Sequence, residues 1–161
     1  MTNKEAVLDY INNHLELHTN GLHGFSHWER VERLGEFISS TNDADQEVLK
    51  LFAYTHDLGR LNDGADPEHG LRSAKIVEDL YKRRIIKLTP EQYQKLFYAC
   101  ANHMVTLAHS NDVTIQACWD ADRLDLWRAD IEPDPQYLYT EVAKKSATII
   151  WAKSLLTGLS F

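Results

Sequence analysis

Histidines and aspartates recur at helical spacings in this chain and form a set that could bind a divalent metal. Five of them begin or end stripes of apolar residues, so their side chains should point inward: His27, His56, His69, His103 and Asp122. Asp57 directly follows His56, and a buried carboxylate is costly unless an opposite charge neutralises it. One divalent cation would neutralise both aspartates, and neutral imidazoles would complete its shell. Such mixed nitrogen and oxygen donors suit Mn, Fe, Co, Ni or Zn.

The adjacent residues His56 and Asp57 limit where such a site can lie. Neighbouring residues of a helix point about 100° apart, so both side chains reach one ion only near a helix end. Leu58-Gly59 follows at once and supplies that end. We therefore expect the metal site where a buried helix terminates.

Helices must carry these residues, because apolar residues repeat with a helical period nearly throughout and strand patterns are nearly absent. We expect an all-α, compact single-domain bundle of about six to seven helices. The expected helices cover about residues 4–17, 27–38, 44–56, 67–84, 90–103, 113–128 and 139–156. The one at 44–56 is apolar nearly all round and should be central. Three starts carry capping patterns, namely Ser26 with Glu29, Asp66-Pro67, and Thr89-Pro90 with Gln92.

Length and composition favour one globular domain and argue against two classes of partner. The chain has 161 residues and a formal net charge of -7 at pH 7, a poor balance for binding a nucleic-acid polymer. The cluster Lys82-Arg83-Arg84 with Lys87 is interpreted as a helix C-terminus. No stretch approaches ~18 apolar residues, so we expect no membrane segment. Cys100 and Cys118 are expected to be buried and unpaired, which fits a cytoplasmic protein.

The order of the candidate ligands resembles the HD superfamily of metal-dependent phosphohydrolases, in which a first His precedes a His-Asp doublet and a distant Asp. The matching residues are His27 in Gly24-Phe25-Ser26-His27-Trp28, the doublet His56-Asp57, and Asp122 in Asp120-Ala121-Asp122-Arg123-Leu124-Asp125. The likeness covers about residues 23–128 of a single domain assigned to residues 1–161. Within the last motif, Asp122 is the expected ligand, Asp125 the reserve and Asp120 the least favoured.

This resemblance implies hydrolysis of a phosphate ester of a nucleotide or another small phosphorylated metabolite. The expected cofactor is one or two ions of Mn, Fe, Co, Ni, Mg or Zn, and a bound metal lowers the pKa of water towards ~7. Asp57 would orient the water or bridge two ions. His69 and His103 would either bind a second ion or act on the substrate, one of them protonating the leaving group. Arg60 is the expected phosphate-binding residue at the rim of the pocket.

Other roles and other functions stay open from the sequence alone. Arg30 and Arg72 are alternative phosphate contacts or exposed ion-pair partners, and His23 is expected near the site. The remaining histidines are expected at the surface: His14, His18 and His109. One alternative function is an HD-type di-iron oxygenase, which a tightly held pair of redox-active irons would indicate. Another is a non-catalytic nucleotide sensor, which the complete set of ligands argues against.

Overall fold

The computed structural model describes residues 1–15 and 21–157, and these residues form helices without a strand. The α-helices are α1 (Asn3–His14), α2 (Phe25–Ser39), α3 (Gln46–Thr55), α4 (His69–Lys82), α5 (Pro90–Asn102), α6 (Val113–Leu124) and α7 (Ser146–Ser154). The short 3-10 helices are η1 (Asp125–Ala129), η2 (Pro135–Tyr137) and η3 (Leu155–Thr157). The all-α prediction is confirmed. None of the helices in the described ranges has both the length and the apolar character that a membrane span requires.

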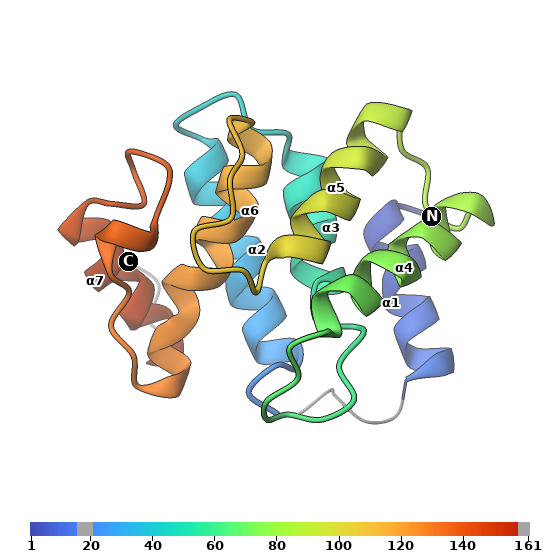
Figure 1. Cartoon of the computed structure of the whole chain (residues 1–161), viewed down its shortest axis with the longest axis horizontal. Coiled ribbons are helices and arrows are strands. Elements are labelled where there is room, and N and C mark those ends of the chain that lie inside the picture. The colour runs from blue at the N-terminus through green and yellow to red at the C-terminus, as the bar shows by residue number, and fades with distance from the viewer. Residues whose placement is uncertain (16–20, 158–161) are drawn as a thin grey trace.

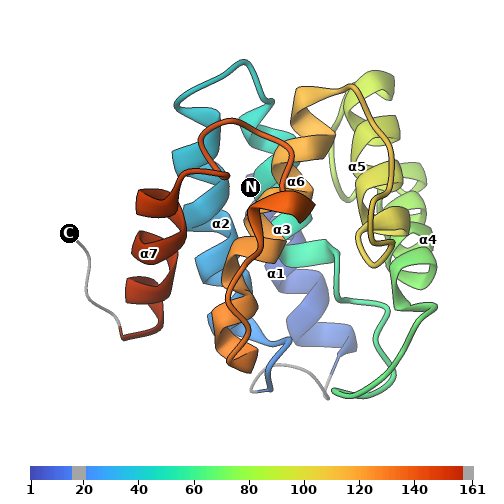
Figure 2. The same ribbon diagram turned by 60° about the vertical axis from the view of Figure 1, so that its left-hand side comes forward.

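Helix α3 lies at the centre of the bundle, as its apolar sequence predicts. It packs against α1, α2, α4, α5 and α6, and every residue from 51 to 60 is buried. Figures 1 and 2 show α4 and α5 side by side at one end of the bundle, with α7 at the other end. The first five residues after α3, from His56 to Arg60, are buried together with the helix, and they include the His56-Asp57 doublet.

Glycine at position 59 allows α4 to pack directly against the end of α3. A Cβ at Gly59 would lie 2.4 Å from the backbone nitrogen of Ser73 and 2.7 Å from the carbonyl oxygen of His69. The Gly59 amide also donates to Ser73 Oγ at 2.9 Å. Any larger residue at position 59 would have to push α4 away. The absence of a side chain at Gly59 therefore determines how closely His69 approaches the His56-Asp57 doublet.

Two predicted helix starts are wrong. Helix α2 begins at Phe25 with Gly24 as its N-cap, so Ser26 lies inside the helix and forms no capping box. Helix α4 begins at His69, two residues beyond the predicted start, because the Asp66 carboxylate instead accepts from Leu61 N and Arg72.

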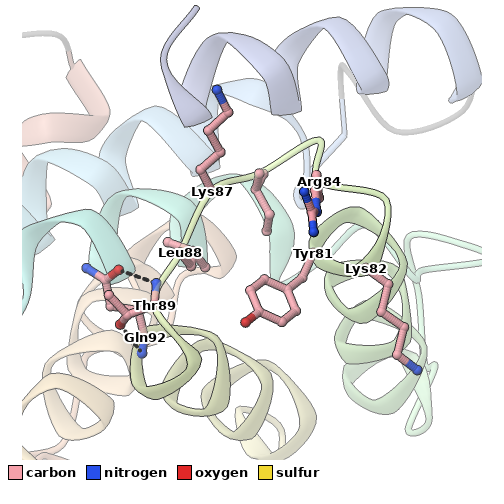
Figure 3. A pocket seen from close by; sticks show the side chains of 8 residues that line it. Tyr81, Lys82, Arg84, Lys87, Leu88, Thr89 and Gln92 are labelled. Atoms are coloured by element: carbon pink, nitrogen blue, oxygen red, sulfur yellow. Dashed lines mark hydrogen bonds between the residues drawn. The ribbon is translucent and has the colours of Figure 1, made fainter.

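The predicted start of α5 is confirmed, and so is the interpretation of the basic cluster at the end of α4. Thr89 and Gln92 form reciprocal capping-box bonds, drawn as dashed lines in Figure 3. Lys82 and Arg83 lie at the C-terminus of α4 and pair with acids one turn earlier. Lys82 and Lys87 point in different directions in Figure 3, away from one another.

The predicted ends of the first, sixth and seventh helices are also corrected. Helix α1 ends at His14 with Leu15 as its extended C-cap, one residue into the predicted continuation. Residues 16 and 17 of that continuation lie outside the described residues, as does His18. Helix α6 ends at Leu124, where the chain tightens into η1. Residues 139–145 are not helical, because Asp120 Oδ1 accepts from Tyr139 N at 2.9 Å and Asp120 Oδ2 accepts from Thr140 N at 2.7 Å. These bonds hold the segment on α6, so the last helix starts only at Ser146.

Candidate metal centre

Five helix ends meet at one place and bring the predicted histidines and aspartates together. His27 stands in the first turn of α2, His69 begins α4, and Asp122 lies in the last turn of α6. His56 and His103 are the C-cap residues of α3 and α5. All four histidines and Asp57 are buried, and the Asp122 side chain is 14% exposed.

One group consists of His27, His56, Asp57 and Asp122. His27 Nε2 lies 3.1 Å from both His56 Nε2 and Asp122 Oδ1, and 3.5 Å from Asp57 Oδ2. His56 Nε2 lies 3.1 Å from Asp57 Oδ2 and 3.4 Å from Asp122 Oδ1. Two donor atoms bound to one ion at about 2.1 Å lie roughly 3.0–3.4 Å apart in octahedral or tetrahedral geometry. The observed separations therefore fit a metal ion.

A second group consists of His69, His103 and the other oxygen of Asp57. His69 Nε2 lies 2.9 Å from His103 Nε2 and 3.1 Å from Asp57 Oδ1, and His103 Nε2 lies 3.6 Å from the same oxygen. Within the described residues, the clusters whose donor atoms all lie close enough to hold an ion are His27, His56 and Asp57, and Asp57, His69 and His103. Asp122 joins the first group through its short distances to His27 and His56. Asp57 belongs to both groups and turns one oxygen towards each.

The protonation of the four histidine rings follows from the partners of their Nδ1 atoms. Three rings donate from Nδ1 to a backbone carbonyl, which can only accept: His56 to Phe52, His69 to Asp66 and His103 to Cys100. His27 Nδ1 donates to Asp125 Oδ2 at 2.7 Å. A neutral ring with its proton on Nδ1 has a lone pair on Nε2. In this neutral form the Nε2 lone pairs of His27 and His56 point into the first group and those of His69 and His103 into the second. This is the tautomer that metal-binding histidines adopt.

This arrangement requires a positive charge at the centre. Two neutral Nε2 lone pairs cannot hydrogen-bond to each other, yet His27 and His56 approach to 3.1 Å. Asp57 Oδ2 and Asp122 Oδ1 are buried and have no hydrogen-bond partner among the described residues. A cation between these atoms would satisfy all of them at once, so the residues fit a divalent metal.

Without a metal, the same electrostatics would be balanced by a proton on His56. Burial opposes the charged form of His56, but the carboxylates of Asp57 and Asp122 outweigh it and raise its pKa to about 10. Burial likewise opposes ionisation of both aspartates, but His56 keeps the pKa of each well below its usual range. A metal that binds here must therefore displace a proton.

Asp125 orients a histidine of the site instead of facing the ion. It is fully buried, and its two oxygens accept from His27 Nδ1 and from Arg30 Nε, each at 2.7 Å. These bonds turn Asp125 away from the centre, so its predicted role as reserve ligand is replaced by one in positioning His27. Arg30 is likewise committed to Asp125 and does not serve as a free phosphate contact.

Asp120, the least favoured of the three acids, holds the chain segment after η2. Burial raises the pKa of Asp120 to about 6, although hydrogen bonds from Thr140 and Tyr139 act in the opposite direction. Its oxygens are taken up by those bonds, so it does not reach the histidine cluster.

A cavity of about 510 Å³ opens above the two groups, with Asp57, His103 and Asp122 in its wall. Arg60, the predicted phosphate-binding residue, also lines this cavity, and its Nε lies 3.4 Å from Asp57 Oδ1. Arg72 is instead bonded to the Gly59 carbonyl and to Asp66. A substrate could therefore approach the carboxylates from this side.

No family model, curated protein or solved structure matches the chain. The structure itself shows an all-α domain whose buried histidines and aspartates could hold a metal ion. Both cysteines of this domain are free and buried, as predicted.

Two arginines in the cavity wall, Arg123 and Arg128, were not predicted from the sequence to belong to the site. Arg128 reaches the cavity because η1 replaces the end of the predicted helix. In a 3-10 helix residues three apart eclipse one another, whereas in an α-helix they differ by about 60°. Arg128 consequently lies over Asp125, donates to its carbonyl at 2.8 Å, and brings Nη2 within 4.0 Å of Asp122 Oδ1. The sequence does show a basic residue three positions after Asp125. However, the direction of its side chain depends on whether the segment is an α-helix or a 3-10 helix.

His23 also lines the cavity, close to the site as expected, without belonging to either metal group. Its Nδ1 lies 2.7 Å from Asp63 Oδ1, and Asp63 also accepts from the backbone nitrogens of Leu22 and His23. His14 and His109 are exposed, which confirms their predicted surface positions.

Proposed function

We propose that this chain is a divalent-metal-dependent phosphohydrolase that hydrolyses a phosphate ester of a nucleotide or another small phosphorylated metabolite, as its resemblance to the HD superfamily suggests. The observation that carries the proposal is Asp57, which presents its two buried oxygens to two pairs of histidine lone pairs beside an arginine-lined cavity. Carboxylates and imidazoles supply the metal site, and guanidinium groups suit phosphate.

The residues divide into two possible metal sites. His27, His56, Asp57 and Asp122 would hold the first ion, and His69, His103 and Asp57 the second. When bound, the metal would supply a water of lowered pKa and would neutralise charge on the phosphoryl oxygens. Because the Nε2 atoms of His69 and His103 face Asp57 Oδ1, we assign these two residues to metal binding instead of acid catalysis.

The remaining residues of the cavity bind the ester and move its proton. Arg60 and Arg128 would hold the phosphate oxygens next to the aspartates. Hydrolysis forms a bond between water oxygen and phosphorus and breaks the bond from phosphorus to the ester oxygen. The departing oxygen needs a proton, which we assign to Nε2 of His23, since Asp63 occupies its Nδ1. The products are an alcohol and inorganic phosphate.

A His23→Gln variant should lose activity in proportion to how much the leaving group needs a proton. For an alkyl phosphate we expect kcat to fall about 100-fold or more, and for 4-nitrophenyl phosphate less than about threefold. Burial lowers the pKa of His23, so its protonated fraction falls as the pH rises, and activity on alkyl esters should decline on the alkaline side. That decline should disappear in the variant. Equal losses on both esters would remove His23 from this role.

The function is tested by assaying the purified protein on phosphomonoesters, nucleotides and phosphodiesters with Mn²⁺, Co²⁺, Mg²⁺, Zn²⁺ or chelator. We expect release of phosphate that requires added or retained metal and that a chelator abolishes. Elemental analysis of the same preparation gives the metal-to-protein ratio. A metal-loaded, folded protein that hydrolyses none of these esters would contradict the proposal, and tight binding of an intact nucleotide would then favour a sensor.

A di-iron oxygenase is the second candidate, because a carboxylate shared between two histidine pairs would also suit two irons. The discriminating measurement is iron content together with oxygen consumption under reducing conditions. Two irons per chain with oxygen uptake, and no phosphate release with any metal, would replace the hydrolase by the oxygenase.

A further inference from the structure

We propose that the cavity beside the metal centre selects a small phosphate monoester whose organic group is aromatic or aliphatic, in preference to a polyhydroxylated one such as a sugar phosphate. The inference rests on the proposed function, since it identifies the substrate class of the same site. Three features of the cavity wall carry it: two guanidinium groups held by backbone carbonyls, an apolar rim that is exposed but anchored, and a limited volume.

Two arginines of the cavity wall, Arg60 and Arg128, have side chains that are 5% and 11% exposed. Backbone carbonyls hold both guanidinium groups in place: Gly64 accepts from Arg60 at 2.9 Å, and Leu22 accepts from Arg128 at 3.0 Å. A carbonyl fixes a guanidinium without cancelling its charge. The two arginines therefore present positive charge beside Asp57 and Asp122, where a phosphate dianion would lie.

The same cavity wall includes the apolar groups of Met104, Leu126 and Tyr137. Met104 and Tyr137 are 45% and 40% exposed, although methionine is a residue type that usually packs inside. Apolar side chains left exposed at the mouth of a pocket are typical of surfaces that a ligand covers.

A single arginine holds this apolar rim in position. Arg123 donates from Nη1 to the Tyr137 carbonyl at 2.8 Å and from Nη2 to the Val105 carbonyl at 3.1 Å. It thereby ties the loop after α5 to the segment that follows α6. The rim is preformed, so a ligand would gain contact area there without ordering a loop first.

The composition of the wall disfavours a hydroxyl-rich organic group. Nine of the eleven wall residues are polar, but seven of them are already assigned to the metal, the phosphate, the leaving group or the anchoring of the rim: Asp57, His103, Asp122, Arg60, Arg128, His23 and Arg123. Thr106 and Tyr137 are left to pair with the organic group. A sugar would lose water from several hydroxyls and find few partners, which is unfavourable, whereas a phenyl or alkyl group would cover Met104 and Leu126. The volume of about 510 Å³ suits a small molecule.

The test measures binding of phosphonates, whose carbon–phosphorus bond is not hydrolysed, to the Mn²⁺-loaded protein by isothermal titration calorimetry. We expect benzylphosphonate to bind about tenfold or more tightly than 3,4-dihydroxybutylphosphonate. Met104→Ser and Tyr137→Ser should each reduce this preference, and the double variant should bring it below about threefold. Leu107→Ser, at an exposed residue of the same loop outside the cavity wall, should keep the preference. Arg128→Met should weaken both phosphonates by a similar factor.

The relative affinity of the unmodified protein for the two phosphonates tests the proposed substrate preference even if a variant fails to fold. Equal or tighter binding of the dihydroxybutyl compound, or no binding of either compound at millimolar concentration, overturns the inference. Phosphate release from sugar phosphates as fast as from aryl and alkyl phosphates also overturns it, while leaving the hydrolase intact. A preference for benzylphosphonate without hydrolysis of any ester supports the shape of the cavity and removes the enzymatic function.

Discussion

Replacing Asp57 by alanine is expected to remove metal binding and ester hydrolysis together while the helical fold remains. One Asp57 oxygen lies 3.1 Å from His56 Nε2 and the other lies 3.1 Å from His69 Nε2, so the substitution takes a ligand from both groups. We expect bound metal to fall to background and kcat/KM to fall roughly a thousandfold or more. His56→Ala should behave in the same way, because it removes the ring between Asp57 and Asp122.

The measurements are elemental analysis, phosphate release and far-ultraviolet circular dichroism on each variant. Asp9→Ala is the matched control, since Asp9 is exposed on α1 and should keep wild-type metal content and activity. Full activity in an Asp57→Ala protein that holds no metal would refute the metal-dependent mechanism.

The second large effect is expected at Asp125, which touches no ion in the proposed site. Asp125→Asn should weaken metal binding by about 10–100-fold, because the carboxylate fixes the Nδ1 proton of His27 and so directs its Nε2 lone pair. The substitution also leaves Arg30 without its buried charged partner. Competition with a chromogenic chelator measures the change in affinity.

Asp120→Asn provides a matched control for that experiment. Asp120 is also a buried acid on α6, but its oxygens accept from Tyr139 and Thr140 instead of from a histidine. Its substitution should lower the melting temperature and leave metal affinity within about twofold, since no ligand loses its support. An unchanged metal affinity in Asp125→Asn, or an equal loss in Asp120→Asn, would show that Asp125 does not position His27.

The helices and the inward direction of the ligands could be predicted because both depend on local information. An apolar stripe predicts which face of a helix is buried. The inward direction of His27, His69 and Asp122 can therefore be predicted from the residues near them in sequence. The His56-Asp57 doublet had to lie at a helix end for the same local reason, and His56 is the C-cap of α3.

The remaining features depend on contacts between residues far apart in the chain. Asp125 accepts from a histidine 98 residues earlier, and periodicity cannot distinguish this role from direct metal binding. The non-helical stretch at Tyr139 depends on Asp120, which competes with the helical bonds the local sequence favours. Arg128 depends on the change from α-helix to 3-10 helix at Asp125, which leaves no mark in the apolar pattern.

The sharing of Asp57 makes the occupancies of the two proposed metal positions depend on each other. The position at His27 and His56 also has Asp122, whereas the position at His69 and His103 has only its share of Asp57. A first cation would therefore reduce the attraction for a second, and by thermodynamic reciprocity the second would weaken the first by the same factor. A bound phosphate dianion would restore the missing negative charge and offset this anticooperativity. Substrate would then recruit the second ion, and the resting and working forms of the protein would differ in metal content.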